Sequence, residues 1–141
     1  MKRRAFLVGL SLALALNAAC KSSEERCKNC GMKIDPKSAW TARLVAPDGT
    51  LVSFDTPRCA LTSWRSGKTQ AKALRVQEYY DRVWRDAVEV RFVIGGDVLG
   101  PMGPDLVPVD GPRAAKFVQD HGADRALPID QVTMEVLNTI K

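Results

Sequence analysis

Short apolar segments that alternate with polar residues recur along the chain between Gly- and Pro-containing turns, a pattern that predicts a β-rich fold. The period of two is clearest over residues 88–94, where Val88, Val90, Phe92 and Ile94 are expected on one face of a strand. Pro108 lacks an N–H group, so its strand is expected at a sheet edge or a bulge. The predicted strands cover residues 40–46, 51–54, 73–79, 88–94, 106–109 and 125–127.

Three segments instead carry the start and stop signals of helices. The first is expected to begin after Thr56, which can cap it, and to end near Gly67. The second is expected between Asp110 and Gly122, and Asp130 is expected to cap a third helix at the C-terminus.

The two halves of this pattern repeat at an offset of 55 residues. Residues 55–60 (Asp-Thr-Pro-Arg-Cys-Ala) correspond to residues 110–115 (Asp-Gly-Pro-Arg-Ala-Ala), and each half places a Gly at the expected helix end. The repeat predicts an α+β fold of two small related ββαβ units, residues 37–85 and 86–141, with the C-terminal helix in the second. The Gly- and Pro-rich loop 95–105, which contains Met102, is longer than a hairpin requires and is a candidate functional loop.

The N-terminus has the pattern of an export signal. Three cationic residues precede an apolar run over residues 5–16, which is too short to span a bilayer comfortably. Small residues stand directly before Cys20, as at a bacterial lipoprotein cleavage site, although Asn17 replaces the usual large aliphatic residue. We therefore expect a signal peptide over residues 1–19, lipidation of Cys20 and a polar tether over residues 20–36, with a soluble secreted form as the alternative.

Composition and charge narrow the class of protein further. The hydrophobic fraction of 45% is typical of a folded domain. The net charge of +5 falls to +2 without the cationic leader, and the remaining basic residues are scattered, so we expect no nucleic-acid partner.

The most informative motif is Cys-Lys-Asn-Cys-Gly-Met at residues 27–32. Its two thiols and one thioether are soft ligands, which favour Cu(I) among the common biological metals. Gly31 permits a tight backbone turn, so that Cys30 and Met32 can face one ion. Neighbouring basic residues favour the thiolate form that binds metal.

Other interpretations of the sulfur residues stay open. Cys27 and Cys30 can form a disulfide in an oxidising compartment, or act as a redox pair. A closed zinc site requires four ligands, usually from two Cys pairs, whereas this chain has one pair, a distant Cys59 and a single His121. Cys59 has the pattern of a small buried apolar residue, and His121 that of a residue at a helix C-terminus. Met102 fits a metal ligand and a side chain filling a gap in the core equally well.

Taken together, these motifs resemble those of the NosL family, copper-binding lipoproteins accessory to nitrous oxide reductase. The segments that carry the resemblance are Cys20, 27–32, 86–87, 93–95, 100–103, 106–108 and 121–122. The resemblance implies two ββαβ units similar to part of the organomercurial lyases. It also implies delivery of Cu(I) to nitrous oxide reductase outside the cytoplasm, assisted by a membrane assembly complex. Cys30, Met32 and Met102 match the family's ligand positions, and the extra thiol Cys59 leaves room for another ligand.

The function expected from these features is metal binding without catalysis. No Ser–His–Asp or paired-carboxylate pattern stands out, and a single His limits acid–base chemistry. We therefore expect a periplasm-facing, lipid-anchored copper chaperone of the cell envelope. The alternatives are a thiol oxidoreductase using Cys27 and Cys30, and a copper-binding module serving another envelope enzyme. If Met102 joins Cys30 and Met32, metal binding should order the tether against the fold.

Overall fold

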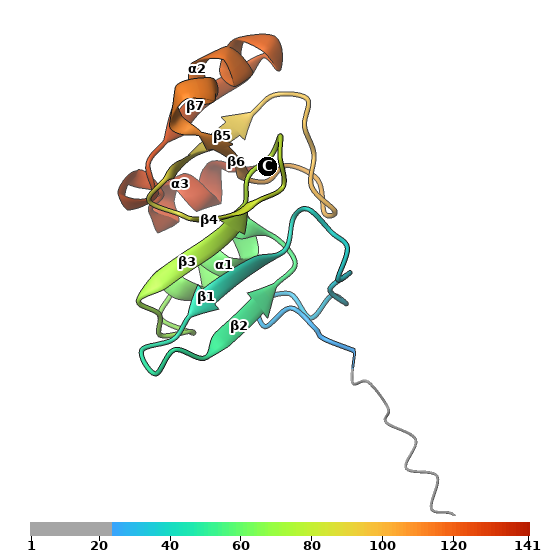
Figure 1. The fold of residues 1–141 in the computed structure, drawn as a ribbon, viewed down its shortest axis with the longest axis vertical. Helices are drawn as coiled ribbons and strands as arrows, with labels where there is room; N and C mark the ends of the chain where they lie inside the picture. Colours follow the sequence, from blue (N-terminus) through green and yellow to red (C-terminus); the bar gives the residue numbers. More distant parts are fainter. Residues whose placement is uncertain (1–23) are drawn as a thin grey trace, which may run out of the picture.

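Two antiparallel sheets, stacked end to end with helices beside them, make up the computed structural model of this chain (Figure 1). The structure describes residues 24–141, so the predicted signal peptide and the lipidation site Cys20 lie outside the described residues. Within residues 24–141, no helix is both long enough and apolar enough to cross a bilayer.

The first sheet holds four strands in the order β2-β1-β3-β4, all antiparallel. Its first two strands form the predicted hairpin, in which Ala42 lies opposite Phe54 and the turn places Gly49 at a φ of +90°. The elements are β1 (Ala42–Val45), β2 (Leu51–Phe54), α1 (Pro57–Arg65), β3 (Ala73–Gln77) and β4 (Trp84–Asp86). The sequence did not predict β4, because three residues are too few to show a period.

The second unit repeats the topology of the first. Its three strands are ordered β6-β5-β7, as the first sheet orders β2-β1-β3, and Pro108 lies on an edge strand as predicted. The elements are β5 (Val90–Gly95), β6 (Val107–Asp110), α2 (Gly111–Asp120) and β7 (Ala123–Leu127), followed by the 3-10 turn η1 (Ile129–Gln131) and α3 (Met134–Thr139). The α+β class and the two ββαβ arrangements are thus confirmed.

Strand β5 is buried on both faces, which corrects the prediction of a single apolar face. Phe92 belongs to the large core, whereas Val93 belongs to a smaller cluster with Phe117 of α2. Val88 was expected on the same strand face as Val90, but it precedes the strand and is 69% exposed. A strand packed on both sides cannot show a pure period of two.

The cap of the last helix also differs from the expectation. Asp130 lies in η1, and Thr133 caps α3 by accepting a hydrogen bond from the Val136 N–H at 3.3 Å. Thr56 caps α1 as predicted, whereas Asp110 precedes α2 but directs its carboxylate to Arg113. Asp and Thr are both good N-cap residues, so sequence alone did not separate Asp130 from Thr133.

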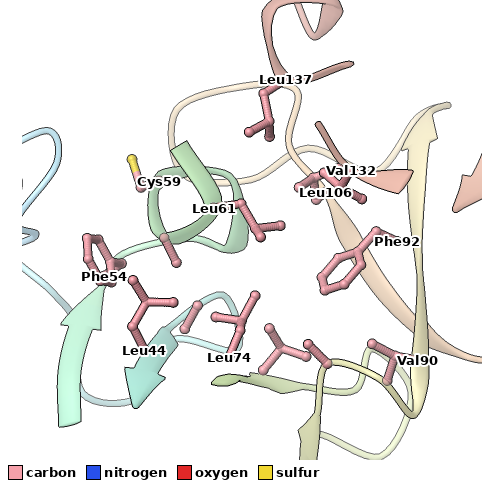
Figure 2. Packing of buried hydrophobic residues seen from close by; sticks show 14 of the residues in the cluster. Leu44, Phe54, Cys59, Leu61, Leu74, Val90, Phe92, Leu106, Val132 and Leu137 are labelled. Atoms are coloured by element: carbon pink, nitrogen blue, oxygen red, sulfur yellow. The ribbon is translucent and has the colours of Figure 1, made fainter. Parts of the chain in front are cut away.

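One continuous hydrophobic core joins the two units. Figure 2 shows Leu44 and Leu74 of the first unit facing Phe92 of the second across this core. Cys59 lies at the margin of the same cluster, beside Phe54 and away from Phe92. The packing therefore fixes α1, and with it Cys59, relative to the second unit.

Candidate metal centre

Residues 26–33 form a tight hairpin that carries the two cysteines of the motif. The Cys27 N–H donates to the Met32 carbonyl at 2.8 Å, and the Gly31 N–H donates to the Cys27 carbonyl at 2.8 Å. Gly31 has a φ of +78°, the left-handed conformation that Gly adopts without strain. Cys27 and Ile34 are buried in the large core. These two side chains hold the hairpin against the fold, and the ordering of the tether by metal stays a prediction.

The hairpin brings Cys27 and Cys30 to two residues at the start of α1. One ligand atom from each of Cys27, Cys30, Asp55 and Cys59 lies within 4.8 Å of the others. Thr56 holds the first turn of α1 by accepting a hydrogen bond from the Cys59 N–H at 3.2 Å. Cys59 was predicted to be a small apolar core residue, and although it is buried, its thiol joins the metal-binding group.

Asp55 is a further member that the sequence analysis missed. It is 5% exposed and accepts a hydrogen bond from the Cys30 thiol on Oδ2 at 3.4 Å. Its other oxygen, Oδ1, is buried and has no hydrogen-bond partner among the described residues. Asp55 and Cys59 stand four residues apart around a helix start, a spacing that could have indicated that they lie close together.

The two buried thiols, Cys27 and Cys59, influence each other's pKa. Interaction with the Cys59 thiol lowers the pKa of Cys27 to about 6, and interaction with Cys27 raises the pKa of Cys59. The Asn29 side chain also donates to the Cys59 sulfur at 3.5 Å. Burial raises the pKa of the Cys30 thiol. The group thus holds one thiolate readily, and binding a cation would release further protons.

Beside this group opens a cavity of about 290 Å³ whose walls come from both units. Cys30, Cys59 and Met102 are among the residues that line it. Met102 lies in a turn closed by the hydrogen bond from the Gly100 N–H to the Gly103 carbonyl at 2.8 Å, and is 57% exposed. It does not fill a gap in the core, so that alternative interpretation is excluded.

The remaining sequence candidates lie elsewhere. Met32 is 39% exposed and is not among the residues that line the cavity. His121 is the C-cap residue of α2, where its Nδ1 pairs with Asp97 at 2.8 Å and its ring packs on Phe117. The helix-end interpretation of His121 is thus supported. The structure brings together Cys27, Cys30 and Cys59, and Met102 lines the same cavity as Cys30 and Cys59, without His121.

Comparison with known proteins identifies the fold and the family. The solved structure of the copper chaperone NosL from Shewanella denitrificans resembles the chain with a TM-score of 0.65 at 18% identity, over 78% of this chain and 90% of that chain. At this identity the likeness demonstrates the shared fold. No curated protein matches the sequence. The NosL family profile matches residues 19–137, which is most of the sequence. The chain belongs to the NosL family.

Proposed function

We propose that this protein binds one Cu(I) ion as cargo and delivers it to nitrous oxide reductase outside the cytoplasm. The observation that carries the proposal is a group of three thiols, two of which line an open cavity together with an exposed thioether. Thiolates and thioethers are soft donors and select Cu(I). The copper chaperone of the same fold supports the assignment.

The ligands that we propose come from the N-terminal hairpin and from the second unit. Cys30 and Met102 line the same cavity, and Cys27 supplies the thiolate that forms most readily. Met32 is two residues from Cys30, and we propose that its exposed side chain adds a second thioether. Cu(I) held partly by exposed thioethers stays accessible to a partner, as a delivery protein requires.

A role as a thiol oxidoreductase fits the site less well. The attacking cysteine of such an enzyme is an accessible thiolate of lowered pKa. Here the lowered pKa belongs to Cys27, which is 3% exposed, whereas the pKa of the exposed Cys30 is raised. This separation favours metal binding without catalysis.

We further propose that lipid on Cys20 anchors the protein to the periplasmic face of a membrane. Anchoring would hold the metal centre close to the membrane assembly complex, because Cys27 follows Cys20 by only seven residues. Mass spectrometry of the membrane-extracted protein should show a diacylglyceryl group on Cys20, and an unmodified Cys20 would contradict the anchor.

The delivery step is tested by copper transfer. The Cu(I)-loaded protein is incubated without oxygen with copper-free nitrous oxide reductase and, separately, with another copper-free envelope enzyme. Recovery of copper in nitrous oxide reductase alone, lost with Cys30→Ser, is the expected result. Equal transfer to both enzymes would indicate a general copper-binding module.

A further inference from the structure

The carboxylate of Asp55 has no role as a ligand in a site that binds Cu(I) through sulfur alone. Cu(I) prefers sulfur, and a carboxylate adds little to such a site. Yet Asp55 is buried, its Oδ1 has no partner, and none of the salt bridges found among residues 24–141 involves it. A buried carboxylate without a cation is costly. This orphaned oxygen therefore points to a positive ion among the thiols.

The four donors have the composition of a closed site for a borderline divalent metal. Zn²⁺ in structural sites is tetrahedral, with Cys sulfur at about 2.3 Å and carboxylate oxygen at about 2.0–2.2 Å. Neighbouring donors around such an ion are about 3.5–3.8 Å apart, by the geometry of a tetrahedron with those bond lengths. The Cys30 Sγ and Asp55 Oδ2 atoms are 3.4 Å apart, and all four donors lie within 4.8 Å of one another. A small contraction of the group would close it around one ion.

The fold also supplies the support that such ligands need. The Asn29 amide donates to the Cys59 sulfur at 3.5 Å, and the Thr56 cap fixes the backbone of Cys59. Groups that orient metal ligands in this way commonly accompany metal centres. The sequence alone argued against zinc because it offered one Cys pair, but folding adds a third thiol and a carboxylate.

We propose that this chain has a second metal-bound state, in which Cys27, Cys30, Cys59 and Asp55 hold one Zn²⁺ ion without either methionine. The Zn²⁺ state stands on the donor set alone and does not depend on copper delivery. Because Cys27 and Cys30 belong to both states, Zn²⁺ and Cu(I) compete, and Zn²⁺ occupies the thiols when copper is scarce.

The test uses the full chain, reduced and free of metal, in detergent without oxygen. Co²⁺ serves as the optical probe, since tetrahedral thiolate coordination gives intense ligand-field and sulfur-to-metal bands. One Co²⁺ per chain with these bands, displaced by one equivalent of Zn²⁺, is expected. Weak octahedral bands, or a failure of Zn²⁺ to displace Co²⁺, would overturn the proposal.

Two variants separate the zinc state from the copper site. Asp55→Asn should lower Zn²⁺ affinity at least tenfold and change Cu(I) affinity less than twofold. Met102→Leu, the matched control, should lower Cu(I) affinity and leave Zn²⁺ affinity unchanged. Unchanged Zn²⁺ affinity in Asp55→Asn, or an equal loss for both metals, would overturn the zinc assignment. Failure of the parent to bind Cu(I) would count against the proposed function only.

If Asp55→Asn does not fold, the zinc K-edge absorption spectrum of the parent protein tests whether Asp55 is a zinc ligand. Three sulfur atoms and one oxygen in the coordination sphere would support the assignment. Four sulfur atoms, or a majority of nitrogen and oxygen, would overturn it.

Discussion

At the scale of single residues, exposure separates the methionines that serve the site from those that pack. Met102 is 57% exposed on the cavity wall, whereas Met134 is partly buried against the large core. The sequence singled out Met102 by its Gly- and Pro-rich loop but left a ligand role and a packing role for it equally open. Its exposure in the folded chain excludes the packing role.

Replacing Met102 or Met134 with leucine should therefore affect Cu(I) affinity differently. Leu nearly conserves the volume of Met, so each variant should cost less than about 1.5 kcal/mol of stability. Met102→Leu removes a thioether ligand and should weaken Cu(I) binding several-fold in chelator competition, whereas Met134→Leu should not. Equal Cu(I) affinity in the two variants would show that Met102 is not a ligand.

Asp105 gives the molecule a measurable pH dependence. It is 6% exposed and accepts the Arg58 and Leu106 N–H groups on Oδ1, and burial raises its pKa to about 6. A carboxyl whose pKa is higher in the folded state than in the unfolded state is stabilised by protonation. Stability from this group therefore rises as the pH falls through about 6 toward the unfolded pKa near 4.

Asp105→Asn should remove this dependence. Between pH 7 and pH 5, the free energy of unfolding of the parent should rise by about 1 kcal/mol relative to Asp105→Asn, as the linkage relation gives for this shift. Urea unfolding at the two pH values measures the difference. Parallel pH profiles for parent and variant would show that Asp105 has the same pKa in the folded and unfolded states.

At the scale of elements, the caps position the ligands. Thr56 and Thr133 both cap helices through their hydroxyl oxygens, but only the Thr56 cap bonds the N–H of a proposed metal ligand, Cys59. The pattern of the chain predicted where α1 begins, yet it left Cys59 as packing, because a buried thiol and a ligand thiol look alike in sequence.

The two caps make a matched pair of variants. Thr56→Ala and Thr133→Ala should each cost about 1 kcal/mol, the usual value of an N-cap. Only Thr56→Ala should also weaken Zn²⁺ binding, because it loosens the turn that holds Cys59. Thermal unfolding and Co²⁺ titration measure the two effects. A similar Zn²⁺ affinity in both variants would show that the Thr56 cap does not contribute to metal binding.

At the scale of the whole molecule, a buried carboxylate joins the two units. Glu78 follows β3 and is fully buried; its Oε1 accepts the Asp110 N–H at 3.2 Å, and Arg113 of α2 lies 3.2 Å from its Oε2. The same oxygen accepts the Tyr80 N–H at 2.8 Å. These contacts of Glu78 with Asp110 and Arg113 hold the second unit, and hence the Met102 loop, against the first unit.

Glu78→Gln should therefore destabilise the protein by about 2 kcal/mol, because the buried charged carboxylate accepts several N–H groups, whereas its partner Arg113 is 40% exposed. Glu89→Gln is the matched control, since exposed Glu89 also accepts a backbone N–H at 2.8 Å, and it should cost less than about 1 kcal/mol. Chemical denaturation compares the two. Equal losses would show that Glu78 contributes no more than an exposed hydrogen bond.

The sequence repeat predicted part of the two-unit architecture. The offset of 55 residues aligns β2 and α1 with β6 and α2 within one residue, so the pairing of units was predictable. The same offset does not align β1 with β5, because the segment between β5 and β6 is longer than the turn between β1 and β2. The metal centre was predictable only in its hairpin half, since Asp55 and Cys59 reach it through tertiary packing.

Copper K-edge absorption during anaerobic Cu(I) titration tests the proposal of copper binding most directly. The account predicts one tightly bound Cu(I) per reduced chain, a coordination sphere of sulfur, and binding that weakens as the pH falls, because the Cys30 thiol must lose its proton to bind and the Cys27 thiolate is itself protonated below about 6. Oxidation of the thiols should abolish the uptake. A sphere built mainly of nitrogen and oxygen, or equal uptake by the oxidised chain, would contradict it.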